Sequence, residues 1–119
     1  IAACRWLTDD EVNVYVTEYA RTEFTGALQG YRVRRGNDPK SMAEMRTFAG
    51  RTIDVPACYI AGKADWGTYQ TPGGFEGMQT QACTNWRGAH LVEGAGHWVQ
   101  QEQPEAVSNI LIEFFREPS

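Results

Sequence analysis

The hydrophobic positions of the chain follow a helical period near both of its ends. Residues 9–24 place their apolar side chains on one stripe, behind Thr8 and Glu11, which have the spacing of a capping box. A second stripe with the same period begins near Pro104 and covers residues 104–115. The pattern therefore predicts an amphipathic helix at each of these two positions.

Shorter helices are expected between the first stripe and the middle of the chain. The stretch "TGALQGYRVRRGN" is expected to continue helically, with a bend, because glycine weakens a helix interior. Asp38 and Pro39 have the residue types of an N-cap and a first helical position, and Gly50 is a typical stop. A helix between Pro39 and Gly50 follows from these signals.

Two short apolar runs, residues 53–62 and 89–92, predict strands. The first is apolar at consecutive positions, which fits a parallel strand covered on both faces. A helix is expected between them, after Pro72, so the order strand, helix, strand, helix predicts a parallel βαβ unit. Two strands alone would leave unpaired edges, so the chain is interpreted as the closing piece of a larger α/β sheet.

Composition and charge narrow the class of protein. The chain has 119 residues, 42% of them hydrophobic, and a net charge of -4, which disfavours a nucleic-acid partner or an anionic membrane. No apolar run is long enough to span a bilayer. Cys4, Cys58 and Cys83 form no metal or disulfide pattern and are expected to be buried apolar residues in a reducing, cytoplasmic compartment. The first residue, Ile1, predicts that the chain begins partway through something longer or has been processed.

Candidate chemistry lies directly after the two predicted strands. Asp65 follows the first strand in "AGKADWG", and His97 follows the second in "GAGHW". In open α/β sheets, functional groups gather beyond the carboxyl ends of strands, and adjacent strands lie about 5 Å apart. A carboxylate on one ring nitrogen of a histidine leaves the other nitrogen as a general base. By itself, Asp65 also fits an ordinary turn and His97 a surface residue.

The stretches "FTGALQGYR", "VPACYIAGKADWG" and "GAGHWVQQEQPEAV" resemble the carboxyl-terminal part of α/β-hydrolases of the epoxide hydrolase and haloalkanoate dehalogenase group. The resemblance implies that residues 1–50 are the end of a helical cap with a linking helix. It implies that residues 51–119 are the last βαβα part of the core. It also implies that His97 is the catalytic base, Asp65 the acid that orients it, and Tyr31 the cap tyrosine that hydrogen-bonds an epoxide oxygen.

Other residues complete the expected site or are excluded from it. Trp66 and Trp98 neighbour the candidate pair and are expected, with Tyr31, to contact substrate. His90 lies inside a predicted strand and forms no convincing metal pair with His97, so neither a metal nor a cofactor is expected.

The resemblance also implies a nucleophile that these residues do not contain. The sequence has no G-x-S-x-G motif, and its three serines, Ser41, Ser108 and Ser119, lie in predicted helices or at the terminus. We therefore expect the catalytic base to be here and the attacking residue to be elsewhere.

These observations lead to two classes of function. The first is a cofactor-independent hydrolase of a small apolar electrophile such as an epoxide, acting through a covalent ester, with a haloacid or haloalkane dehalogenase or an esterase as alternatives. This chain alone would lack the nucleophile and be inactive. The second is a non-catalytic piece that associates through an exposed sheet edge. The expected partners are a small-molecule substrate and either the missing amino-terminal portion of the same protein or a second copy.

Overall fold

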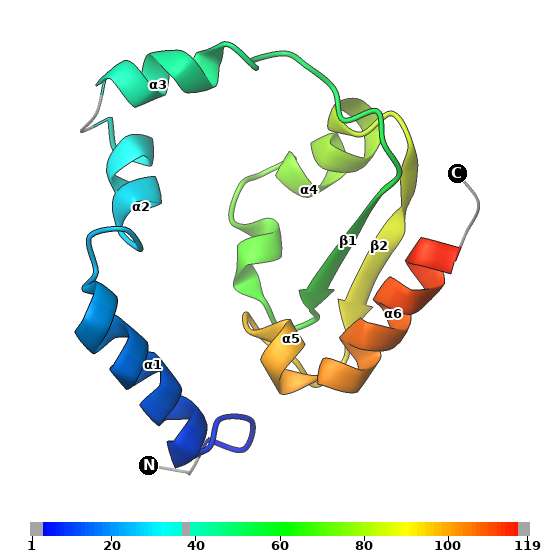
Figure 1. The fold of residues 1–119 in the computed structure, drawn as a ribbon. Coiled ribbons are helices and arrows are strands. Elements are labelled where there is room, and N and C mark those ends of the chain that lie inside the picture. Colours follow the sequence, from blue (N-terminus) through cyan, green and yellow to red (C-terminus); the bar gives the residue numbers. More distant parts are fainter. Residues whose placement is uncertain (1–3, 37–38, 117–119) are drawn as a thin grey trace. The chain divides into compact units, whose positions relative to one another are not determined.

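The computed structural model describes residues 4–36 and 39–116 of the chain (Figure 1). Internal contacts divide the chain into two units, Ile1–Gly50 and Arg51–Ser119. The first unit consists of helices, and the second contains a two-stranded sheet with helices around it. No helix in the described ranges is both long and apolar enough to cross a membrane.

Helix α1, Asp9–Thr22, begins with the predicted capping box. The backbone N–H of Thr8 donates to Glu11 Oε2 at 2.7 Å, and the N–H of Glu11 donates to Thr8 Oγ1 at 3.3 Å. These bonds satisfy two amides that a helix start otherwise leaves without partners. The pKa of the Glu11 carboxyl is lowered because its Oε2 accepts hydrogen bonds from the backbone N–H and from the hydroxyl of Thr8. The apolar stripe of α1 is not buried within the described part of the chain.

The glycine-containing stretch after α1 is helical only in its second half. The chain leaves α1 through Glu23, which has a positive φ of 57°, and forms turns before α2, Gln29–Arg34. The predicted continuation is therefore interrupted, because a residue with this backbone conformation cannot extend a right-handed helix. Gly30 lies within α2, and Tyr31 follows it.

Helix α3, Pro39–Arg46, begins at the predicted proline. The predicted N-cap, Asp38, lies outside the described residues. The helix ends earlier than expected, and a series of turns leads on to Gly50, which has a φ of 77°. A left-handed conformation of this kind favours glycine.

The sheet of the second unit consists of two parallel strands, as predicted. Strand β1 is Ala57–Gly62 and strand β2 is Trp86–Val92, with Gly62 paired to Val92 at their carboxyl ends. β1 starts later than predicted because the preceding residues make only an isolated bridge, Ile53 to Cys83. β2 starts earlier than predicted and includes Gly88, which has a φ of 124°. A glycine has no side chain to contribute to a hydrophobic pattern, so the pattern did not indicate a strand at this position.

The connection between the strands contains short helical turns. A 3-10 helix, η1, covers Trp66–Tyr69, and the predicted helix is formed by α4, Gly74–Gly77, followed by one π-helical turn, η2, Met78–Ala82. After β2 come a short helix, α5, Val99–Glu102, and the long terminal helix α6, Pro104–Arg116, which contacts β2 (Figure 1). The terminal helix begins at the proline that the sequence predicted.

The buried core of the second unit is small. It is formed by Ala95, Val99 and Val107, with Ile60 and Val92 packed against them. The residues of β1 before its last two are only half-buried, and other apolar side chains of this unit are exposed, among them Ile53, Val55, Leu111, Ile112 and Phe115. The expectation that the first strand is covered on both faces is therefore not met within the described residues.

The cysteines differ from the sequence-based expectation. Cys83 is buried, but Cys58 is half-buried and Cys4 is exposed, and all three are free. Partial burial raises the pKa of the Cys58 thiol. The prediction of three buried cysteines was thus wrong for Cys4, because it was based on the usual preference of cysteine for the interior and not on the local pattern.

Candidate active site

Asp65 lies just beyond β1 and is fixed by its own local structure. Its side chain is the N-cap of η1, with Oδ1 accepting the backbone N–H of Gly67 at 2.8 Å. Its backbone N–H donates to the carbonyl of Gly62 at 3.0 Å, which makes a tight turn at the end of the strand. The carboxylate is almost completely buried, with 10% of its side chain exposed. The local hydrogen bonds with Gly62 and Gly67 therefore orient Asp65 independently of its contact with His97.

The two loops that follow the strands are joined by backbone hydrogen bonds. Lys63 donates its N–H to the carbonyl of Val92 at 2.8 Å, and Ala64 donates to Ala95 at 3.0 Å. A Cβ at Gly62 would lie 2.2 Å from the carbonyl oxygen of Gly96 and 2.3 Å from that of Ala95. Only glycine permits this approach, and the approach brings the second loop against the end of β1.

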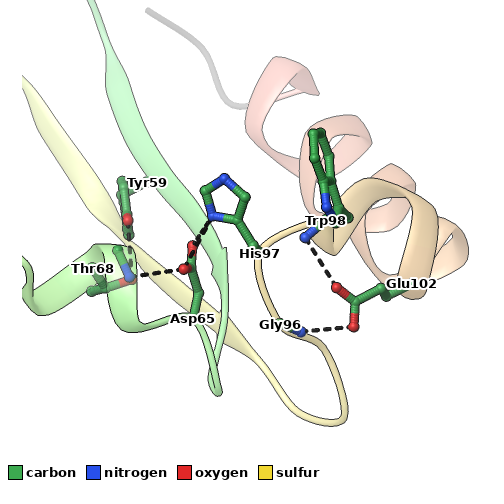
Figure 2. A network of polar contacts seen from close by, with 8 residues as sticks. Tyr59, Asp65, Thr68, Gly96, His97, Trp98 and Glu102 are labelled. Carbon is green, nitrogen blue, oxygen red and sulfur yellow. Dashed lines mark hydrogen bonds and ion pairs between the residues drawn. The ribbon is translucent and has the colours of Figure 1, made fainter. Parts of the chain in front are cut away.

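His97 projects from the second loop toward Asp65 (Figure 2). Its Nδ1 lies 3.2 Å from both Oδ1 and Oδ2 of the carboxylate. The contact predicted from the two strand ends is therefore present. Because Asp65 occupies Nδ1, the other ring nitrogen, Nε2, is on the side of the ring away from the carboxylate.

The electrostatic surroundings keep Asp65 ionised. The hydrogen bond from the Gly67 N–H is the largest cause that lowers the pKa of the carboxyl, and the contact with His97 lowers it further. Burial raises the pKa; this effect is smaller than that of the Gly67 hydrogen bond but larger than that of the hydrogen bond with His97, and the pKa is lowered overall. A charged acceptor at Nδ1 fixes the tautomer of the imidazole and stabilises a proton on the ring.

The remaining predicted site residues are exposed within the described chain. Trp66 is the first residue of η1. Trp98 directly follows His97, and the rings of His97 and Trp98 lie edge to face at a centroid distance of 5.4 Å. Tyr31 lies on α2, in the first unit, and the structure does not place it relative to His97. The roles of these three aromatic residues in substrate contact stay predictions.

A shallow hollow of about 300 Å³ lies beside the Asp65 turn. Tyr59 and Thr68 are on its wall, and their hydroxyl groups are 3.1 Å apart.

No group of three or more metal-ligating side chains occurs among residues 4–36 and 39–116.

Sequence reasoning missed two residues that shape the site. Gly62 gave no signal, because its close contact is with a loop more than 30 residues later. Glu102 lies in the "GHWVQQEQPE" pattern, but its residue type alone predicts no role. Its carboxylate accepts the backbone N–H groups of Gly96 and Trp98, which flank His97 (Figure 2). The spacing of four residues between Trp98 and Glu102 could have indicated this contact, because one helical turn brings a side chain back beside the residue four positions earlier.

Comparison with known proteins finds relatives and structural neighbours of the chain. No protein-family model matches the chain. Epoxide hydrolase A of Mycobacterium tuberculosis is 37% identical over 112 residues, which are 92% of this chain and 32% of that protein. The crystal structure of epoxide hydrolase A from Mycobacterium thermoresistibile superposes with a TM-score of 0.73 at 38% identity, covering 97% of this chain and 34% of the other. Potato (Solanum tuberosum) epoxide hydrolase I gives 0.77 at 28% identity, with 94% and 35% covered.

The chain therefore has the fold of the carboxyl-terminal portion of an α/β-hydrolase. Its relatives and structural neighbours are epoxide hydrolases, and the predicted resemblance is confirmed. The chain spans about a third of the length of the relatives it matches.

Proposed function

We propose that these residues form the carboxyl-terminal portion of an epoxide hydrolase that acts through a covalent ester, with His97 as the base and Asp65 as the acid that orients it. The observation that carries the proposal is the contact of His97 Nδ1 with both oxygens of Asp65, beyond the carboxyl ends of adjacent parallel strands. The relatives support the choice of substrate class, since those compared above are epoxide hydrolases. We call the proposed longer protein the complete enzyme.

The proposed chemistry has two steps, of which this chain supplies the second. In the first step, an aspartate carboxylate of the complete enzyme, on an earlier strand-to-helix turn, attacks an epoxide carbon; an ester forms as the ring C–O bond breaks and the freed oxygen takes up a proton. A serine at that position would form an ester only by acyl transfer from an ester substrate, which is the esterase alternative. His97 then removes a proton from water through Nε2, and the hydroxide attacks the ester carbonyl, which breaks the acyl C–O bond, releases the diol and restores the carboxylate. The proton makes the ring an imidazolium, which the adjacent Asp65 carboxylate stabilises.

Three aromatic residues have proposed substrate contacts. By its match to the family's cap tyrosine, Tyr31 donates a hydrogen bond to the epoxide oxygen while the ring opens. Trp66 and Trp98 contribute apolar surface beside the reacting atoms. Both indoles neighbour the candidate pair in sequence and are exposed in the described chain, so they have area available for a ligand.

The reaction class is tested by comparing substrates on the complete enzyme. We expect turnover of epoxides to diols that exceeds turnover of haloacids, haloalkanes and aryl esters. Tyr31→Phe should reduce epoxide turnover strongly, because ring opening needs a donor at the departing oxygen and halide departure does not need a hydroxyl. Preferred turnover of a halide or an ester, insensitive to Tyr31→Phe, would replace the epoxide assignment by one of the two alternatives.

A second proposal concerns association. The described sheet contains only β1 and β2, so each strand has one unpaired edge, and exposed apolar residues such as Ile53 and Val55 lie nearby. Such edges recruit further strands. We propose that the 119 residues bind the amino-terminal portion of the complete enzyme, with self-association as the alternative. Co-expression of the two portions tests this: a stoichiometric complex is expected, and a compact monomer that ignores the other portion would contradict it.

A further inference from the structure

Glu102 holds the backbone on both sides of the candidate base. Its Oε2 accepts the N–H of Gly96 at 2.8 Å, and its Oε1 accepts the N–H of Trp98 at 3.0 Å. The two amides belong to the residues directly before and after His97, so one carboxylate spans the histidine (Figure 2). Hydrogen bonds from N–H groups to a charged acceptor are stronger than those between neutral groups.

The carboxylate is itself held in place by the turn that follows. The backbone N–H of Glu102 donates to the carbonyl of Trp98 at 2.9 Å, so Glu102 contacts Trp98 through both its backbone and its side chain. This turn is anchored by Val99, which is buried in the core with Ala95. The backbone from Gly96 to Glu102 is therefore closed by hydrogen bonds to Glu102 and is fixed to the hydrophobic core through Val99.

The imidazole of His97 has little packing around it. The carboxylate of Glu102 lies close to Gly96, where a Cβ would be 3.4 Å from Oε1 and 3.6 Å from Oε2, distances of ordinary van der Waals contact. His97 itself has 60% of its side chain exposed, so in the described chain side-chain packing restrains its ring little. Besides its contacts with Asp65 and the Trp98 ring, the imidazole is therefore held by its own backbone, which Glu102 binds on both sides.

From this geometry we infer that Glu102 is a positioning residue, which fixes the loop of His97 so that the imidazole meets Asp65. The expected effect on the rate of ester hydrolysis rests on the proposed function. The expected effect on the contact between His97 and Asp65 rests on the structure alone. Loss of the carboxylate frees two N–H groups and lets the ring leave Asp65. A misplacement of about 1 Å in a catalytic group costs on the order of 100-fold in rate.

The test uses Glu102→Ala and Glu102→Gln in the complete enzyme, with Glu113→Ala, an exposed glutamate of α6, as the matched control. Single-turnover kinetics separate formation of the ester from its hydrolysis. We expect Glu102→Ala to slow hydrolysis roughly 10- to 100-fold with ester formation changed less than about threefold. Glu102→Gln should lie between this variant and the wild type, because an amide oxygen accepts one of the two N–H groups. Glu113→Ala should match the wild type.

A second measurement is independent of activity. The proton on His97 Nδ1 should give a downfield NMR resonance in the wild type, assigned by its loss in His97→Gln, and this resonance should broaden or vanish in Glu102→Ala but persist in Glu113→Ala. An unchanged resonance, or equal loss of both kinetic steps, would overturn the inference, the latter indicating a general role in folding. If the wild type forms no ester, the proposed function is wrong, while the resonance still decides whether Glu102 positions His97.

Discussion

Replacing Gly62 by alanine should displace the loop that carries the candidate base. The added methyl carbon would lie 2.2 Å and 2.3 Å from two backbone carbonyl oxygens, those of Gly96 and Ala95. Backbone atoms cannot rotate away as the end of a flexible side chain does. The loop must therefore move away from β1 as a unit, and the residue that follows Gly96 is His97.

The size of the effect follows from these distances. The loop has to open by about 1 Å to restore an ordinary van der Waals contact. This movement lengthens the hydrogen bond from Ala64 N–H to the Ala95 carbonyl, which is 3.0 Å long, and separates His97 from Asp65. Overpacking costs about 1–3 kcal/mol of folding free energy, and a shift of about 1 Å in a catalytic group costs on the order of 100-fold in rate.

Urea unfolding and single-turnover kinetics of the complete enzyme measure the two consequences. Gly77→Ala is the matched control, because Gly77 lies in α4 and the added carbon would meet no atom within 4 Å outside its chain neighbours and its own helix backbone. Alanine there should leave the enzyme equally stable or stabilise it by about 0.5–1 kcal/mol, since glycine is the poorer helix former. If Gly62→Ala were as stable as this control and hydrolysed the ester at the wild-type rate, the close approach of the loop to β1 would be refuted.

Two further predictions concern Asp65 and the chain by itself. The pKa of Asp65 is lowered on folding, so its contribution to stability is present above the ordinary pKa of about 3.9 and is lost as the pH falls through the lower folded value. Asp65→Asn should therefore reduce the loss of unfolding free energy that accompanies this fall in pH. An equal loss in the wild type and in Asp65→Asn would show that the carboxylate is not stabilised as described. The 119 residues alone should turn over no epoxide, haloacid or aryl ester, because the proposed nucleophile lies outside them; turnover well above a His97→Ala control would contradict this.

The helices were predictable where their signals are local. The capping box of Thr8 and Glu11 and the proline at residue 104 each mark a helix start within a few residues, and the structure places α1 and α6 there. Strand limits were less accessible. Gly88 belongs to β2 because Trp86 and Ala89, which precede and follow it, pair with β1, and a hydrophobic pattern does not record such pairing.

The contact between Asp65 and His97 was predictable from the topology, but the residues that hold the His97 loop in place were not. Asp65 and His97 each follow a strand, and parallel strands bring such residues to one edge of a sheet. The roles of Gly62 and Glu102 depend on the path of the loop between β2 and α5. That path is set by tertiary contacts, so residue types alone did not indicate it.

The most direct test of the account is the fate of the ester when His97 is replaced. In the complete enzyme, His97→Gln should still form the ester if the nucleophile is an aspartate, since a carboxylate needs no base to attack, but should fail to hydrolyse it. His90→Gln, at the other histidine of the chain, is the control and should turn over normally. Intact-protein mass spectrometry after incubation with an epoxide should show a stable adduct of substrate mass in His97→Gln alone. A His97→Gln enzyme that forms no adduct would contradict a base that acts only in the second step and would indicate a serine nucleophile, and one that turns over normally would remove His97 from the mechanism.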